Sequence, residues 1–147
     1  MADILALSKR APFPAWDAAA ADYAAYHRTP GNQACHLVGI PLIVLGLVRL
    51  TQFEVIAPAP LVAALWPVYL FWDLRLAAAM AALLAACAWL AGTMSMAAGT
   101  AVFAAGWVFQ LVGHAVYEKK RAAFQNNLLH LLVGPAWILA KALRLKA

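Results

Sequence analysis

The chain has 147 residues, of which 66% are hydrophobic and only 12% are charged. One core of this size cannot bury so much apolar side chain, so the composition excludes an ordinary soluble domain. It predicts a single membrane-embedded domain that covers residues 1–147. The net charge of +5 comes from basic residues that flank apolar runs, which is typical of contact with lipid headgroups. The sequence contains no recognisable nucleic-acid-binding module.

The N-terminal part is mixed in polarity and predicts a short amphipathic helix on the membrane surface. In "PAWDAAAADYAAYH" (14–27), Asp17 is a helix-start signal, and alanines and aromatic residues follow it. "RTPG" (28–31) is expected to break this helix, because proline and glycine interrupt helices.

Four membrane spans are expected after this break. The first has close to the roughly 20 residues that a bilayer crossing requires, and Arg49 and Glu54 near its far end are expected to reach the opposite headgroups. The second is short and contains Pro67. The next uncharged stretch is too long for one crossing and is divided by small and hydroxyl residues. The expected spans are 37–56, 61–72, 76–91 and 97–116, with turns at 57–60 and 91–100.

The last apolar segment, about 127–141, contains Gly134 and Pro135 and predicts a re-entrant or interfacial helix. The predicted fold is therefore an all-α integral membrane protein. The positive-inside rule predicts that both termini and most basic residues lie on the cytoplasmic side, in a bacterial inner membrane, with Arg49 on the other side. The basic residues on the first side are Lys9, Arg10, Arg28, Arg75, the run 119–121 and the group Lys141, Arg144 and Lys146.

Four histidines, all that the sequence contains, fall at the cytoplasmic ends of these segments. His27 and His36 precede the first span, His114 ends the fourth, and His130 begins the last apolar segment. Imidazole is a common ligand of iron, zinc and copper, so the four predict one metal site at the membrane boundary. For each histidine alone, an ordinary polar group at the interface is the alternative.

Two further residues accompany the histidines. Glu118 follows His114 at the i, i+4 spacing of one helix face, so it could orient the imidazole, bind the metal, or pair with neighbouring lysines. Asn32 lies between His27 and His36 and could hydrogen-bond a ligand or cap the following helix.

Two motifs carry a resemblance to a known family. "YAAYHRTPGNQACHLVGIP" (23–41) fits Tyr-x3-His-x4-Asn-x3-His-x2-Gly-x-Pro, and "WVFQLVGHAVYEKKRAAF" (107–124) fits Trp-x2-Gln-x2-Gly-His-x2-aromatic-Glu. Over roughly residues 15–140 the chain resembles the 2-hydroxy fatty acid dioxygenases of fungi and bacteria. It departs from them at "RAA" (121–123), where the family often has Pro-Ala.

The resemblance implies an iron(II)-dependent membrane enzyme of fatty acid α-oxidation, which uses O₂ to shorten a 2-hydroxy fatty acid by one carbon. It implies His27, His36 and His114 as iron ligands, with His130 as a fourth. Candidate catalytic residues beside them are Glu118, Asn32 and Tyr26. Arg28 or Lys119 is a candidate partner for the substrate carboxylate, while the acyl tail would lie among the helices.

Two other classes of function remain open at this stage. A haem protein would use two histidines as axial ligands. A non-catalytic membrane scaffold or small transporter would need no metal. The sequence predicts neither the oligomeric state nor the preferred acyl chain length.

Overall fold

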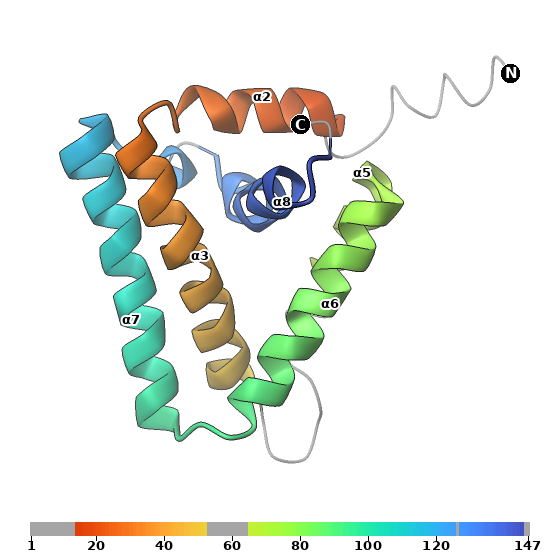
Figure 1. The fold of residues 1–147 in the computed structure, drawn as a ribbon, viewed down its shortest axis with the longest axis vertical. Coiled ribbons are helices and arrows are strands. Elements are labelled where there is room, and N and C mark those ends of the chain that lie inside the picture. The colour runs from red at the N-terminus through yellow and green to blue at the C-terminus, as the bar shows by residue number, and fades with distance from the viewer. Residues whose placement is uncertain (1–13, 53–64, 126, 146–147) are drawn as a thin grey trace, which may run out of the picture.

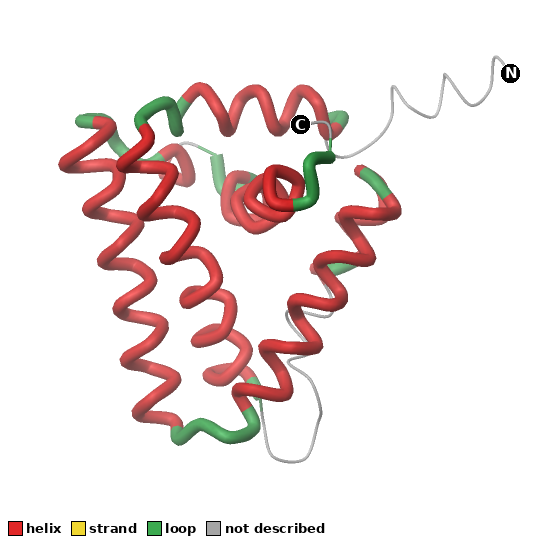
Figure 2. Tube along the Cα trace, in the orientation of Figure 1, coloured by secondary structure: helices red, strands yellow, loops and turns green. Residues whose placement is uncertain are grey.

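The computed structural model describes residues 14–52, 65–125 and 127–145. Within these ranges the protein is all-helical, with no strand (Figures 1 and 2). Three segments are long and apolar enough to cross a membrane: α3 (Pro30–Thr51), α6 (Leu74–Ala91), and α7 (Met96–Val112) with its π-helical continuation η1 (Gly113–Glu118). The shorter elements are α2 (Trp16–Ala25), α5 (Pro67–Trp72), the 3₁₀ turn η2 (Ala123–Gln125) and α8 (His130–Ala142).

The three long helices form a wedge that the short helices close at one end (Figure 1). Helices α3 and α7 lie side by side, and α6 diverges from them above the α6–α7 turn. Helix α8 lies between α3 and α6 at the wide end of the wedge, and α2 lies across this end. This closed end carries the residues that the sequence singles out.

Small residues allow α3 and α7 to approach closely. A Cβ atom built on Gly39 would lie 2.8 Å from the carbonyl oxygen of Gly106, and one on Gly106 would lie 2.8 Å from that of Gly39. Such contacts replace the hydrophobic driving force that is missing between helices in lipid. They hold the histidine-bearing ends of the two helices together.

A second packing region joins α2 to α8. The buried residues of α2 are Trp16, Ala19, Ala20 and Tyr23, whose i, i+3, i+4, i+7 spacing forms one helix face. Tyr23 packs against Trp137 of α8, with ring centroids 5.4 Å apart. The cluster continues through α5, α6 and α8 with Tyr69, Leu76, Ala77, Met80, Val133, Ala136 and Ala140. This packing fixes α2 over the end of the bundle.

The first long helix begins earlier than the expected span at residue 37. Thr29 is its N-cap, because the Thr29 side chain accepts a hydrogen bond from Asn32 N, and Pro30 occupies the first helical position. "RTPG" therefore starts α3 as well as ending α2. Helices α6 and α7 agree closely with the predicted spans 76–91 and 97–116, and Ser95 caps α7 within the predicted turn.

The predicted crossing at 61–72 is described only in its last part. Here α5 packs on α6, and Asp73 ends α5 and caps α6 by accepting from Arg75 N and Leu76 N. In Figure 1, α3 ends at the narrow end of the wedge and α6 begins at the closed end, as another crossing between them would require. Residues 53–64, which include Glu54 and the expected turn at 57–60, lie outside the described residues. The count of four crossings stays a prediction.

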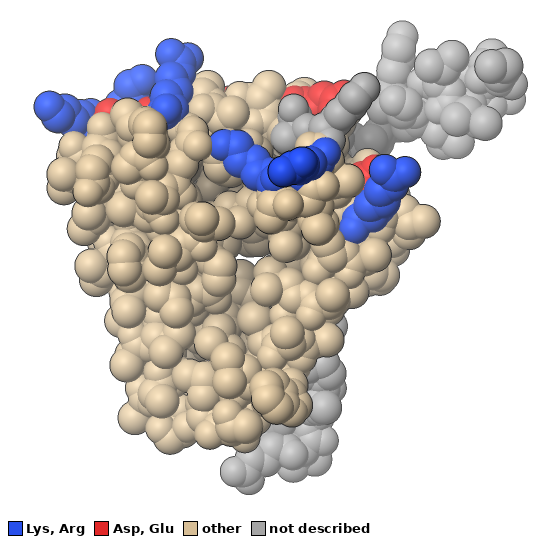
Figure 3. All heavy atoms as spheres, in the orientation of Figure 1, with Lys and Arg blue, Asp and Glu red and all other residues tan. Residues whose placement is uncertain are grey.

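The Lys and Arg side chains in view gather at the level of α2 and α8, whereas the surface of the long helices below is uncharged (Figure 3). Arg49, near the other end of α3, donates from Nε to Met94 O at 2.7 Å in the α6–α7 turn. The predicted basic residues Lys9, Arg10 and Lys146 lie outside the described residues.

Candidate metal centre

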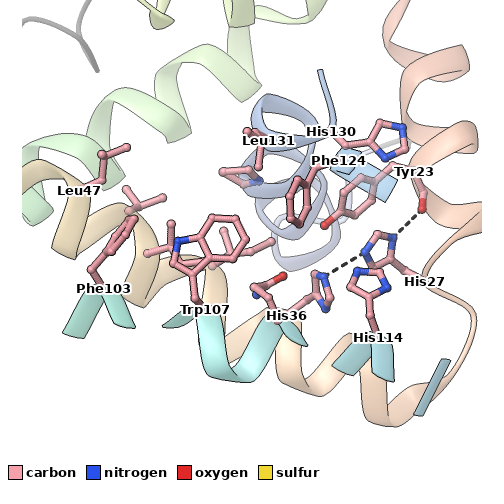
Figure 4. A pocket seen from close by; sticks show the side chains of 16 residues that line it. Tyr23, His27, His36, Leu47, Phe103, Trp107, His114, Phe124, His130 and Leu131 are labelled. Atoms are coloured by element: carbon pink, nitrogen blue, oxygen red, sulfur yellow. Dashed lines mark hydrogen bonds between the residues drawn. The ribbon is translucent and has the colours of Figure 1, made fainter. Parts of the chain in front are cut away.

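The structure brings three of the four histidines together. His27 lies in the turn between α2 and α3, His36 in the second turn of α3, and His114 in η1. All three are buried, and each offers a ring nitrogen within 4.8 Å of those of the other two. Figure 4 shows the three imidazoles gathered at one end of a cavity. Segments far apart in the sequence thus form one candidate metal site.

Main-chain carbonyls orient two of these rings. His27 Nδ1 lies 2.6 Å from Tyr23 O, and His36 Nδ1 lies 2.9 Å from Asn32 O. Because a carbonyl can only accept, each Nδ1 carries the proton, and each neutral ring directs the lone pair of Nε2 into the cluster. A carbonyl partner on the outer nitrogen is the usual support of a metal-binding histidine.

The inner nitrogens fit a shared cation. The Nε2 atoms of His27 and His36 are 3.0 Å apart, so two neutral rings oriented in this way would bring two lone pairs face to face. A metal between them relieves that repulsion. Two metal–nitrogen bonds of about 2.1 Å at a right angle separate their nitrogens by about 3.0 Å, which agrees with the observed distance.

His114 completes the set and has an unsatisfied atom. Its Nδ1 is buried and has no hydrogen-bond partner among the described residues. Leaving a buried polar atom unpaired costs roughly 1–3 kcal/mol, and a metal bond would remove that cost. The preceding Gly113 is required by close approach, because a Cβ atom there would lie 2.5 Å from Asn32 Oδ1.

Burial keeps His27 in the form that binds metal. Burial disfavours the imidazolium and lowers the pKa of His27 to about 4, although the hydrogen bond to the Tyr23 carbonyl acts in the opposite direction. The ring is therefore neutral near pH 7, as a metal ligand must be.

Glu118 holds the loop that connects two of the histidines. Its carboxylate accepts hydrogen bonds from Arg28 N and Thr29 N, both at 3.1 Å, from Thr29 Oγ1 at 2.9 Å, and from Asn32 Nδ2 at 3.2 Å. The predicted i, i+4 helix face with His114 is not formed, because residues 113–118 are π-helical. Its contacts support a role in positioning His27 and His36 through the loop.

Asn32 is fully buried at the centre of this loop. Its Nδ2 also donates to Tyr26 O at 3.3 Å, and its own carbonyl accepts from His36. It thus hydrogen-bonds a candidate ligand through the main chain, whereas Thr29 provides the predicted helix cap. The Tyr26 ring lies edge-on to His130, with centroids 5.5 Å apart.

The other predicted residues lie outside the three-histidine cluster. His130 is buried, and its Nε2 lies 2.7 Å from Asp22 Oδ2, while its Nδ1 has no hydrogen-bond partner among the described residues. It lines the same cavity, and its role as a fourth ligand stays a prediction. Arg28 and Lys119 are exposed and do not line this cavity. Lys119 ends η1 in a left-handed conformation, with φ 54°.

The cavity has a volume of about 300 Å³ and lies between α3, α7 and α8. The histidines lie at one end, and Leu47 and Phe103 lie towards the other (Figure 4). Sequence reasoning did not identify the lining, although the signal was present. From His36 and from His114, lining residues follow at distances of 4, 7 and 11 residues, which is the spacing of one helix face. The two rows are His36, Ile40, Ile43 and Leu47 on α3, and His114, Gln110, Trp107 and Phe103 on α7 and η1.

Comparison with known proteins agrees with the resemblance seen in the motifs. The model of the family described as 2-hydroxy-palmitic acid dioxygenase Mpo1-like matches residues 15–146. The 2-hydroxy-palmitic acid dioxygenase MPO1 of Saccharomyces cerevisiae is 29% identical over 120 residues, which cover 76% of this chain and 69% of that protein. No solved structure matches the chain. On the family match, which spans both motifs and all three clustered histidines, the chain belongs to the 2-hydroxy-palmitic acid dioxygenase Mpo1-like family.

Proposed function

We propose that this protein is an iron(II)-dependent membrane dioxygenase that shortens a 2-hydroxy fatty acid by one carbon with O₂. Membership of the family supports the dioxygenase class. The observation that carries the proposal is the cluster of three histidines at the end of an otherwise largely apolar cavity. Polar and apolar parts of the site are thus arranged like the polar head and acyl tail of the substrate.

The proposed reaction balances without a further oxidant. The bond between C1 and C2 breaks, C2 becomes the new carboxyl carbon, and C1 leaves as CO₂. O₂ accepts four electrons, three from C2 and one from C1, and the remaining oxygen leaves as water. The products are the fatty acid one carbon shorter, CO₂ and water.

His27, His36 and His114 would hold the iron. When bound, iron(II) supplies coordination positions for substrate oxygens and O₂. The backbone carbonyls of Tyr23 and Asn32 keep two imidazoles in the tautomer that presents Nε2 to the ion. Glu118 holds the loop between them in place. These residues prepare the ligands before the substrate arrives.

The cavity walls would bind the tail and exclude water from the reacting end. Ile40, Ile43 and Leu47 line one side, and Phe103 and Trp107 line the other. Burying these surfaces against an acyl chain contributes about 0.8 kcal/mol per methylene. The predicted carboxylate partners Arg28 and Lys119 are exposed, so their positions suit attraction of the acid at headgroup level.

The orientation in the membrane belongs to the same proposal. We place the histidine end and both termini on the cytoplasmic side of a bacterial inner membrane. The gathering of Lys and Arg at the level of α2 and α8 supports this orientation through the positive-inside rule (Figure 3).

The geometry argues against His27 and His36 as the two axial ligands of a haem. Two axial nitrogens on opposite sides of an iron would be about 4 Å apart or more, given metal–nitrogen bonds of about 2.0 Å, with the porphyrin between the rings. The Nε2 atoms of His27 and His36 are 3.0 Å apart. They suit adjacent positions on one ion.

The test is conversion of 2-hydroxyhexadecanoic acid by the purified protein. The protein is stripped with a chelator, loaded with iron(II) without oxygen and exposed to air, and the products are measured by mass spectrometry. We expect pentadecanoic acid from the 2-hydroxy acid and no product from hexadecanoic acid. Zinc loading should give an inactive protein, since zinc binds the same nitrogens but has no redox chemistry. An iron-loaded protein that forms no shortened acid would contradict the proposal and favour a non-catalytic role.

A further inference from the structure

We propose that Gln110 binds the carboxylate of the substrate by donating a hydrogen bond from Nε2. This inference rests on the proposed function for the identity of the ligand. Gln110 is 7% exposed, and its Nε2 is buried without a hydrogen-bond partner among the described residues. A buried amide donor without a partner is costly, and its side chain lines the cavity. These observations indicate an acceptor that arrives with a ligand.

The position of Gln110 along α7 places it at the boundary between polar and apolar lining. It precedes His114 by four residues, and both side chains line the cavity. Trp107 and Phe103 follow it along the same row into the apolar part. A substrate whose head lies at the histidines therefore passes Gln110 within the first few atoms of its chain.

The neighbouring helix provides no competing partner. A Cβ atom on Gly39 would lie 2.5 Å from Gln110 Nε2. The amide is thus packed against the bare backbone of α3, which leaves its donor unpaired. A side chain at position 39 would displace it.

The charge of the cavity explains why a carboxylate needs this donor. The described lining residues include no Lys or Arg. An anionic head in this cavity therefore depends on the metal and on neutral donors. The carboxylate is the better acceptor for Gln110, because hydrogen bonds to ionised groups are about twice as strong as neutral ones. The 2-hydroxyl group can donate its own proton and has less need of an external donor.

The experiment uses two analogues that separate the two oxygen groups. Hexadecanoic acid has the carboxylate without the 2-hydroxyl, and 1,2-hexadecanediol has the hydroxyl at C2 without the carboxylate. Their binding to the iron-loaded protein is measured without oxygen, so that no turnover is needed. The variant is Gln110→Met, which keeps the side-chain length and removes the donor. The matched control is Gln125→Met, at an exposed glutamine of η2.

We expect Gln110→Met to weaken binding of hexadecanoic acid by roughly tenfold to a hundredfold, as for loss of one hydrogen bond to a charged group. Binding of the diol and the iron content should stay unchanged, and Gln125→Met should bind both compounds like the wild type. Gln110→Glu, which adds a carboxylate beside that of the ligand, should weaken acid binding further. If Gln110→Met does not fold, the Glu variant carries the same comparison.

Two results with the variants would overturn the inference: unchanged acid binding in both Gln110 variants, or an equal loss for acid and diol, which would show a merely structural role. Wild-type protein that binds neither analogue would overturn it as well. The proposed function fails separately, when wild-type protein forms no shortened acid under air. Selective loss of acid binding at Gln110 would then still establish the carboxylate contact.

Discussion

Glu118 forms its hydrogen bonds with the loop between two candidate metal ligands, His27 and His36. Its two oxygens accept four hydrogen bonds from the three residues Arg28, Thr29 and Asn32. Two of the donors are main-chain N–H groups near the start of α3, where a carboxylate is also favoured by the helix dipole. The end of η1 is thereby tied to the loop that separates His27 from His36, and we propose that the carboxylate positions the two imidazoles through this loop.

Glu118→Gln should therefore lower iron affinity while leaving the ligands in place. The glutamine side chain keeps one acceptor oxygen, but its NH₂ group faces N–H and O–H donors. Some of the hydrogen bonds that hold the loop are therefore lost. We expect a loss of about 10–100-fold in iron affinity, as for other outer-shell partners of metal ligands. Iron titration monitored by a competing chelator measures it. Asp17→Asn, at an exposed carboxylate of α2, is the control, and equal affinities for both variants would contradict the role.

Histidine variants should separate the three clustered residues from the fourth. His114→Ala should abolish turnover and strongly reduce bound iron, because the cluster loses one of its three inner nitrogens. His130→Ala should reduce bound iron less, because Nε2 of His130 already contacts Asp22. Iron per protein after gel filtration decides between them. An equal loss of iron in the two variants would indicate that His130 binds the iron as directly as His114 does.

The two helices that line the cavity set its length. From His114 to Phe103 there are eleven residues, or about 16 Å of helix. An extended chain of single bonds advances about 1.2 Å per bond, since a backbone advances up to about 3.6 Å over three. The row therefore accommodates about 13 bonds beyond the histidine end. The far end, near Leu47 and Phe103, is where chain length would be sensed.

Leu47→Trp should shift the preferred substrate to shorter 2-hydroxy acids. The larger side chain fills the far end of the cavity, and each methylene that no longer fits costs tenfold or more in relative kcat/KM, by the usual scale of about 1–3 kcal/mol. Competition between C16 and C12 2-hydroxy acids measures the preference. Val108→Trp, at an exposed position on α7, should leave it unchanged. The idea fails if both variants keep the wild-type ratio.

Much of the helical architecture follows from patterns that are local in sequence. Uncharged stretches of sufficient length predict α6 and α7, and small and hydroxyl residues predict the turn before Ser95. Helix α3 begins before the expected span because Thr29 and Pro30, which are expected to break a helix, also form a helix N-terminus. The thickness of the bilayer thus makes the length of a span predictable from sequence. The residue at which a helix begins depends on capping interactions and is harder to predict.

The site was predictable as a set of residue types but not as a geometry. Helix ends at one membrane level bring all four histidines into one hypothesis, and the structure gathers His27, His36 and His114. The contact of His130 with Asp22 joins residues 108 positions apart, and no local pattern indicates it. The π-helical turn that directs Glu118 away from the predicted face depends likewise on tertiary contacts. The residues that line the cavity follow simple helix spacing on α3 and α7. Sequence alone does not show that these two helix faces enclose a cavity, because it does not show which helices are neighbours.

At the scale of the whole molecule, the arrangement of helices makes a topological prediction. Cysteines introduced at Arg75 and Lys120 should react with a membrane-impermeant reagent from the same side, and a cysteine at Ser95 from the opposite side. The native Cys35 and Cys87 are replaced by alanine to give a silent background. Labelling of intact and inverted vesicles is compared by mass shift. Labelling of positions 75 and 120 from opposite sides would contradict the four-crossing topology.

The wide separation of His27 and His114 along the chain has a consequence for biogenesis. A nascent chain that has inserted only α3 presents His27 and His36, and the third imidazole arrives after α6 and α7 have entered the bilayer. Closing a loop of this length has an entropic cost that helix packing offsets first. The three histidines therefore come together only in the completed bundle, and we expect the order insertion, then assembly, then metal loading. Truncated or misassembled chains would present an incomplete ligand set, which limits loading to mature protein.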